Sequence, residues 1–261
     1  MRGWPWFPTR GPSMLDAHLT EMRELEDHYW WFIARRRVAL ALLDDAHLAA
    51  PKLLDAGCGA GALLAELSAR GRAVGVDLSP SAIAITKDRG LGGLIQADLQ
   101  HLPIAREAFD AVMLCDVLEH VLDDEQALRE AARVLRPGGI AVITLPALAF
   151  LWSTHDQALG HHRRYHPSRV RRIVIDAGLT VERMSFGLFL LFPVAVVLRG
   201  FQRLVHRRRG GPPQTGIIRV PAFLNCLLVR LMDLENALLH RLNLPIGVSL
   251  VVVARKGGRP P

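Results

Sequence analysis

The stretch LLDAGCGAGALLAEL, residues 53–67, decides the fold. An apolar run ends at Asp55, three glycines follow within five positions, and a helical pattern begins immediately afterwards. A glycine-rich turn between a strand and a helix leaves backbone N–H groups unpaired at the helix N-terminus, where they hold an anionic or polar cofactor. The stretch therefore predicts a strand, a cofactor-binding turn and a helix.

The same alternation of apolar strands and amphipathic helices continues along the chain. Strands are expected at 52–55, 73–77, 93–97, 110–115, 140–145, 179–185 and 248–254, and helices at 60–70, 80–89, 124–135 and from 167 to just before Gly178. Ser79 with Pro80 marks a helix start, and the RPGG segment 136–139 is expected to end a helix before a strand. Alternating strands and helices form βαβ crossovers, so the expected fold class is α/β with a mainly parallel sheet.

Length and composition favour one domain with additions. The chain has 261 residues, half of them apolar. We expect a flexible N-terminus over 1–13 and a single domain over 14–261, with a helical segment at 16–44, a core at 28–184, an insertion at 186–247 and a last strand at 248–254. The three cysteines lack CxxC spacing and no secretory signal is evident, which favours a reducing cytoplasm.

Read alone, Gly57, Gly59 and Ala62 match the dinucleotide pattern G-x-G-x-x-G/A, with Asp77 placed for ribose hydroxyls. The surrounding residues favour another cofactor. Asp55 precedes the glycines, Gly61 adds a third, and the segments GVDLS (75–79), QADL (96–99), FDAVMLCDVLEHV (109–121) and RPGG (136–139) follow in order.

Together these five motifs resemble those of class I S-adenosylmethionine-dependent methyltransferases. The resemblance covers about residues 28–184, and HDQALGHHRRY (155–165) is similar to a segment of a bacterial subgroup associated with lipid-linked or glycan substrates. It implies a Rossmann-like seven-stranded sheet with helices on both faces, an N-terminal helical lid and a helical insertion before the last strand. It also implies S-adenosyl-L-methionine as cofactor and S-adenosyl-L-homocysteine as product.

By the same resemblance, glycines 57, 59 and 61 pass close to the methionine part, Asp77 takes the ribose hydroxyls and Asp98 the adenine amino group. A carboxylate at a strand end suits hydroxyl donors, since it only accepts hydrogen bonds. The other expected cofactor residues lie beside these motifs or on the lid: Asp55, Cys58, Leu78, Leu99, Cys115 and Arg36. The alternative is that Asp77 only caps a helix and the glycines only make a tight turn.

Candidate catalytic residues follow the fourth and fifth strands, namely Glu119 with His120, and His155 and His161. The two later histidines are the preferred bases, because imidazole titrates near neutral pH and a carboxylate such as Asp156 can orient it. The alternative is a solvated loop whose His166 caps the next helix. No metal is expected, since the histidines match no ligand spacing and methyl transfer needs none.

Substrate contacts are predicted at Arg163, Arg164, Tyr165 and Trp31. A guanidinium binds phosphate or carboxylate through two hydrogen bonds, although the two arginines could equally form an exposed run. For Trp31 and its aromatic neighbours, packing is the stronger alternative.

The last part of the chain is strongly basic. Residues 185–261 hold 11 Lys and Arg against 2 Asp and Glu, whereas residues 1–184 hold 21 against 23. Cationic helices of the insertion suit an anionic membrane surface or an acyl or isoprenoid chain, and a helical subdomain with an incidentally basic rim is the equal alternative. Nucleic acid is less favoured, because aromatic residues are not interleaved with the basic ones.

These observations predict a methyltransferase that acts on an oxygen of an amphiphilic, glycan or lipid-linked small molecule, in the cytoplasm and in peripheral contact with its membrane. The alternatives are an RNA or small-metabolite methyltransferase, or a non-catalytic partner subunit with the same fold. The sequence sets no oligomeric state.

Overall fold

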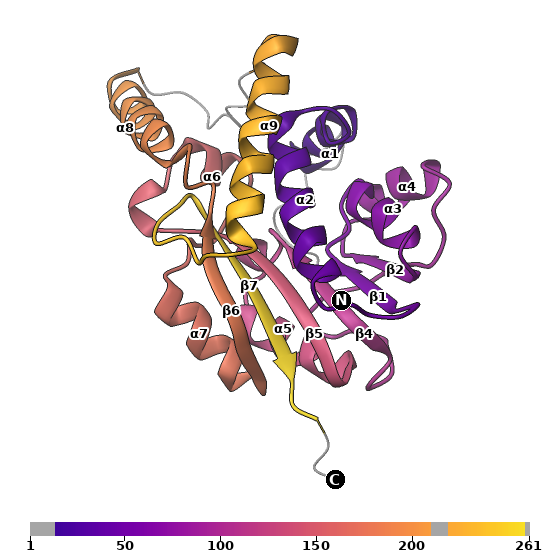
Figure 1. The fold of residues 1–261 in the computed structure, drawn as a ribbon. Helices are drawn as coiled ribbons and strands as arrows, with labels where there is room; N and C mark the ends of the chain where they lie inside the picture. Colours follow the sequence, from indigo (N-terminus) through magenta and orange to yellow (C-terminus); the bar gives the residue numbers. More distant parts are fainter. Residues whose placement is uncertain (1–13, 210–218, 259–261) are drawn as a thin grey trace.

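A computed structural model describes residues 14–209 and 219–258, with side chains for 19–203 and 219–258. Figure 1 shows one twisted sheet with helices packed on both of its faces. The predicted flexible segment 1–13 lies outside the described residues.

The sheet has seven strands in the order β3-β2-β1-β4-β5-β7-β6. The strands are β1 (Lys52–Ala56), β2 (Arg72–Asp77), β3 (Leu94–Gln96), β4 (Phe109–Cys115), β5 (Leu135–Pro146), β6 (Leu179–Gly187) and β7 (Ser249–Lys256). All neighbours from β3 to β5 are parallel, and β7 runs antiparallel between β5 and β6. The predicted seven-stranded, mainly parallel sheet is therefore confirmed.

The main helices are α1 (Met14–Leu25), α2 (Trp30–Asp44), α3 (Ala62–Ser68), α4 (Pro80–Asp88), α5 (Asp124–Val134), α6 (Thr154–Ala158), α7 (Pro167–Asp176), α8 (Phe192–Arg209) and α9 (Ala222–Leu239). Two single turns are η1 (Leu118–His120) and η2 (Ala149–Leu151). Apolar residues of α5 and α7 form one core with the sheet, and those of α2, α3 and α9 form a second core on the opposite face. Because both faces are covered, the central strands are almost continuously buried.

Side chains cap the N-termini of two helices, as the sequence predicts. The Ser79 side chain accepts a hydrogen bond from the Ala82 N–H, with Pro80 at the first helical position. His166 accepts from the Ser168 N–H at the start of α7, which confirms the capping role considered for it.

Two boundaries differ from the sequence-based prediction. The expected single helix 16–44 is broken into α1 and α2, because the chain turns at Glu26 and the Trp30 N–H donates to the Asn225 side chain of α9 at 2.9 Å. The RPGG segment does not lie ahead of its strand but inside β5, which already begins at Leu135 and pairs irregularly with β4 there.

The insertion before the last strand is helical where it is described. In Figure 1, α9 lies alongside α2, and Arg37 of α2 pairs with Asp233 of α9 at 2.6 Å. Among the described residues, no helix is long and apolar enough to cross a membrane. The basic loop HRRRGGPPQTG of the prediction falls on residues 206–216, whose side chains are outside the described part.

Candidate active site

The glycine turn joins β1 to α3 at the carboxyl edge of the parallel strands. Gly57, Gly59 and Gly61 all have positive φ, at 86°, 54° and 89°, a region that glycine enters without steric cost. The Gly57 and Cys58 N–H groups both donate to the Val76 carbonyl, at 2.7 and 3.0 Å. This ties the turn to the end of β2.

Neighbouring segments approach the turn so closely that side chains are excluded. A Cβ on Gly57 would lie 2.4 Å from Val117, the residue just before η1, and one on Gly61 would lie 2.8 Å from Thr86 of α4. The Thr86 hydroxyl also donates to the Gly59 carbonyl at 2.9 Å. The glycines therefore bring the backbone of the turn against the segment that follows β4.

Three carboxylates gather around this turn. Asp55 is 1 % exposed, and its Oδ2 has no hydrogen-bond partner. Burial, with repulsion from Asp77 and Glu26, raises the pKa of Asp55 to about 8. Asp77 accepts from the Gly59 N–H at 3.0 Å and the Ser79 N–H at 2.9 Å, and burial raises its pKa despite these bonds. An unsatisfied buried carboxylate beside two others favours a ligand that brings positive charge.

The predicted adenine side of the site lies at the ends of β2 and β3. Asp98 is half-buried and accepts from the Gln100 backbone N–H at 2.9 Å, while Leu99 is buried. Leu78 is 64 % exposed although it directly follows Asp77. An exposed leucine beside the carboxylate predicted to bind the ribose is suited to cover the face of a base.

The N-terminal helices close over the turn from the opposite side. Arg89 donates to the Ala60 carbonyl at 2.6 Å and pairs with Glu26 between α1 and α2. Met22 of α1 approaches Gly59, where a Cβ would lie 2.7 Å from its methyl group. The predicted lid is thus a helix pair that Arg89 fastens to the turn.

The lid arginine expected at the cofactor, Arg36, instead donates to the Glu26 carbonyl at 2.8 Å and lies 3.8 Å from Glu66. The arginine that reaches the strand ends is its neighbour Arg35, which sequence reasoning missed. Arg35 forms an ion pair with Asp116, whose other oxygen accepts from the Thr144 hydroxyl at 2.9 Å. Burial lowers the pKa of Arg35 to about 10, so its side chain stays charged at neutral pH.

Asp116 itself has a φ of +54° directly after β4, and such a conformation in a non-glycine residue costs of order 1–3 kcal/mol. Its neighbour Cys115 is half-buried, and burial raises the pKa of that thiol to about 12. Burial likewise raises the pKa of the Cys58 thiol. Both cysteines therefore sit at the site as neutral groups.

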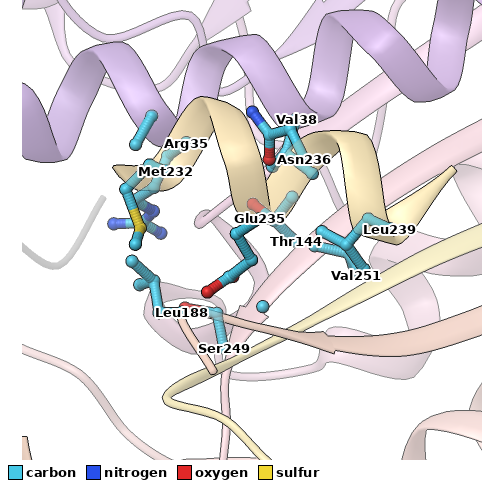
Figure 2. Close-up of a pocket in the computed structure, with 12 residues that line it drawn as sticks. Arg35, Val38, Thr144, Leu188, Met232, Glu235, Asn236, Leu239, Ser249 and Val251 are labelled. Carbon is cyan, nitrogen blue, oxygen red and sulfur yellow. The ribbon is translucent and has the colours of Figure 1, made fainter. Parts of the chain in front are cut away.

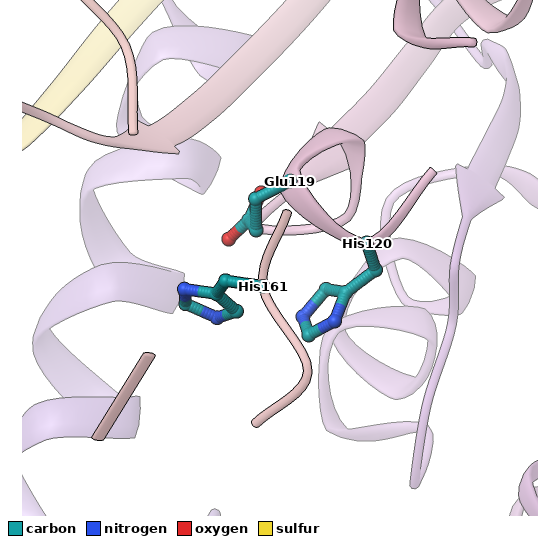
Figure 3. A group of neighbouring side chains, drawn as sticks. All are labelled: Glu119, His120 and His161. Atoms are coloured by element: carbon teal, nitrogen blue, oxygen red, sulfur yellow. The ribbon is translucent and has the colours of Figure 1, made fainter. Parts of the chain in front are cut away.

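The structure brings the predicted catalytic residues together. Glu119 and His120 lie on η1, and His161 follows α6. Figure 3 shows the three side chains turned toward one another, and one ligand-type atom from each lies within 4.8 Å of the others. We call Glu119, His120 and His161 the His-Glu cluster. The His155 ring lies 6.4 Å from that of His161, beside the cluster.

The buried carboxylate of Asp156 orients one member of this cluster. Its Oδ1 lies 3.0 Å from His161 Nδ1 and 2.8 Å from Arg164 Nε. Burial alone would raise the pKa of Asp156, but the His161 hydrogen bond and the Arg164 charge hold it well below its ordinary value. An ionised carboxylate only accepts hydrogen bonds, so Nδ1 of His161 carries a hydrogen.

The other predicted substrate residues are held by the protein itself. Arg164 is buried and donates to the Ala147 carbonyl at 2.9 Å. Arg163 pairs with Asp124 at 2.8 Å, and the fully buried Tyr165 donates its hydroxyl to the same carboxylate at 2.9 Å. All three side chains are therefore engaged in contacts within the protein. Trp31 is half-buried, with the Arg35 guanidinium 5.3 Å from its ring centroid.

A mostly apolar pocket lies beside Arg35. Figure 2 shows it between α2, α9 and the sheet, with Leu188, Met232 and Glu235 around the open space. Its lining includes the side chains of Arg35, Val38, Thr144, Leu188, Met232, Glu235, Asn236, Leu239, Ser249 and Val251. Glu235 is buried and accepts from the Leu190 N–H at 2.9 Å. Since two walls come from the lid and the insertion, the segments outside the core shape this pocket.

Comparison with known proteins identifies the class of this site. Residues 54–143 match a family model described as a methyltransferase domain. A probable S-adenosylmethionine-dependent methyltransferase of Mycobacterium tuberculosis is 30 % identical over 194 residues, which cover 71 % of this chain and 68 % of that protein. A ubiquinone biosynthesis O-methyltransferase of Chromobacterium violaceum is 29 % identical over 60 % of this chain and 81 % of its own length.

Among solved structures, the [4+2]-cyclase SpnF has the same fold, with a TM-score of 0.61, 20 % identity and coverage of 94 % of this chain and 93 % of its own. A cyclase on this fold shows that the fold alone does not decide the reaction. The sequence relationship does decide the family: the chain belongs to the class I S-adenosylmethionine-dependent methyltransferases.

The residues present fit S-adenosylmethionine. Its ammonium and sulfonium groups are positive, and the turn offers the unpartnered buried oxygen of Asp55 beside Asp77. Its carboxylate suits the backbone N–H groups at the start of α3. The missing Cβ atoms at Gly57 and Gly61 let the turn pack directly against Val117 and Thr86.

We expect Asp77→Ala to weaken cofactor binding more than Asp98→Ala. Asp77 is predicted to accept from two ribose hydroxyls and also holds the Gly59 N–H of the turn, whereas Asp98 is predicted to make one adenine contact. Removing charged hydrogen bonds costs about 1.5–3 kcal/mol each, or roughly 10- to 100-fold in affinity. Calorimetric titration with S-adenosylhomocysteine measures this. Equal and negligible losses in both folded variants would place the pocket elsewhere.

The raised pKa of Asp55 predicts a pH-dependent stability. Because its folded-state pKa of about 8 exceeds the unfolded value near 3.8, the folded state binds more protons in between, and stability falls as pH rises from about 4 to 8. Asp55→Asn removes this contribution. In cofactor-free protein, the free energy of unfolding should fall with pH more steeply for wild type than for the variant, by up to about 1.4 kcal/mol per pH unit.

Denaturant unfolding between pH 5 and 8 measures both slopes. Identical slopes for wild type and Asp55→Asn would show that Asp55 is already ionised in the folded, cofactor-free protein.

Proposed function

We propose that this methyltransferase acts on an oxygen of an amphiphilic small molecule, such as an isoprenoid or a lipid-linked glycan. The observation that carries the proposal is the position of the His-Glu cluster. Val117, two residues before Glu119, packs against the glycine turn at Gly57. Groups that accept protons therefore lie next to the turn assigned to the cofactor.

S-adenosylmethionine supplies a methyl group activated by a positive sulfonium. An attacking hydroxyl must lose its proton, and a positioned base contributes about 10²–10⁴-fold to such a reaction. In neutral His161, the hydrogen on Nδ1 points to Asp156, which leaves Nε2 with a lone pair to take the proton. Burial raises the pKa of Glu119 to about 7 against the opposing charges of Arg35 and Arg164, so its carboxylate also titrates near neutral pH.

The choice of an amphiphilic acceptor is supported by the insertion. Its helix α8 exposes Val194, Val197 and Phe201 to 53 %, 70 % and 63 %. On α9, Phe223 is 75 % exposed. Apolar side chains in such number suit a lipid chain or surface. The relative named as an O-methyltransferase of ubiquinone biosynthesis supports oxygen as the accepting atom.

Labelling of a source-cell extract tests the acceptor class. The extract is incubated with methyl-tritiated S-adenosylmethionine and the purified protein, and then partitioned between butanol and water. We expect label in the butanol phase with wild type and at least about tenfold less with Asp77→Ala, in line with the loss of cofactor affinity. Label found only in RNA or protein would contradict the proposal.

A second part of the proposal is that α8 and α9 rest on an anionic membrane surface where the acceptor is drawn in. Vesicles containing phosphatidylglycerol should carry wild-type protein upward in flotation at low salt and less of it at high salt. Phe201→Ser with Phe223→Ser should lower binding at least about tenfold, since burying each phenyl ring contributes about 1.5–3 kcal/mol.

Ile175→Ser on α7, where the isoleucine is 55 % exposed, is the matched control and should bind as wild type does. Absence of wild-type binding, or an equal loss in the control, would refute the membrane contact while leaving the acceptor class to the labelling experiment.

A further inference from the structure

We propose that Glu119, His120 and His161 bind one divalent transition-metal cation. Two imidazoles and one carboxylate are a ligand set that proteins use for Zn²⁺, Mn²⁺ and Fe²⁺. One ligand atom from each side chain lies within 4.8 Å of the others, and Figure 3 shows all three directed into a common space. Among the described residues, this is the group of His, Cys, Asp and Glu side chains that comes together closely enough to hold a metal.

The carboxylate of Glu119 gives an independent reason to place a ligand here. Glu119 is 1 % exposed, and its Oε2 is buried without a hydrogen-bond partner. A buried polar atom without a partner costs free energy, and a charged one costs more. A cation bound here would be a direct partner for this oxygen. It would offset the free-energy cost of burying the Glu119 carboxylate.

His161 is prepared as a ligand by the residue behind it. Its side chain is 7 % exposed and lies 3.0 Å from Asp156 through Nδ1. Histidine ligands almost always donate their other ring N–H to a carboxylate or carbonyl, which fixes the ring and increases its basicity. Asp156 is itself held by Arg164 and by Ser153. Nε2 of His161 is thereby left as the atom for the metal.

His120 supplies the exposed side of the site. Its ring centroid lies 4.7 Å from that of His161, nearly perpendicular to it. Bond lengths of about 2.0–2.2 Å place the ligand atoms about 3.3–3.6 Å apart around a tetrahedral zinc-type cation. The ligand atoms, which lie within 4.8 Å of one another, therefore have to move closer together when a cation binds. Three protein ligands leave further positions for water or for an acceptor oxygen.

The role of the cation in the reaction, unlike its binding, rests on the proposed function. With the cation bound, Nε2 of His161 is a ligand and no longer a base, and the cation instead lowers the pKa of a hydroxyl that it ligates. The cluster follows Val117 at the glycine turn. The sequence predicted no metal, because the histidines match no known ligand spacing and methyl transfer needs none. In the chain, His161 lies far from Glu119 and His120. Folding of the chain brings His161 close to Glu119 and His120.

Direct metal binding tests the proposal without any methyl transfer. Full-length protein, free of an affinity tag and treated with a chelator, is titrated with Co²⁺ by calorimetry and by its visible absorption. We expect one Co²⁺ per chain with absorption bands of a low-coordinate site. Glu119→Gln and His120→Ala should each weaken binding at least about tenfold, as even changes behind metal ligands cost 10- to 100-fold.

His162→Ala is the matched control, because His162 is exposed, adjacent to His161 and outside the cluster. It should bind Co²⁺ within about twofold of wild type. His120 is also exposed, so His120→Ala should fold and decide the test even if Glu119→Gln does not. Absence of a one-to-one complex in wild type, or a complex that His162→Ala weakens as much as His120→Ala does, would overturn the proposal.

A parallel titration with S-adenosylhomocysteine separates this inference from the proposed function. Protein that binds S-adenosylhomocysteine and methylates lipid-soluble material but takes up no Co²⁺ would refute the metal site alone. Protein that binds Co²⁺ through the cluster but puts label only into RNA or protein would support the metal site and refute the proposed acceptor.

Discussion

The buried carboxylate of Asp156 is the contact on which the arrangement of the site depends. It is 0 % exposed and accepts hydrogen bonds from Ser153, His161 and Arg164, with Arg199 of α8 3.3 Å away. Removing such a charge from water is costly, and the cost is offset only when several donors surround it in good geometry. Because those donors come from separate segments, satisfying one carboxylate fixes α8, His161 and the strand end at Ala147 relative to one another.

Two separate groups of charged side chains lie around the strand ends. At the glycine turn, Asp55, Asp77 and Glu26 make an acidic environment suited to a positive cofactor. Beyond β4, Arg35 sits across from Asp116 and lines the pocket under α9. Residues of α1 and α2 border both regions, so the helical lid adjoins the turn assigned to the cofactor and also the pocket beside Arg35. A movement of α2 would therefore alter both regions together.

Much of the core could be predicted because its signals are local. Glycines with positive φ, the Ser79-Pro80 cap and the period of buried strands each act within a few residues, and the sheet follows from them. The break at Glu26 could not be predicted in this way, because it depends on Arg89 and on Asn225. Both partners are distant in the chain, whereas the helical periodicity of 16–44 continues across the break.

The same distinction explains the outcome for the HDQALGHHRRY segment. Its histidines and arginines look alike in sequence, yet Arg164 is buried against Asp156 while His162 is exposed. Contacts with β5, α5 and α8 decide which side chains of this segment are held within the protein and which face the site. Tyr165 is an example, since its hydroxyl is directed to Asp124 of α5 and not to a substrate. A motif of this kind identifies the segment that builds the site, and only the packing of the whole chain assigns the individual side chains.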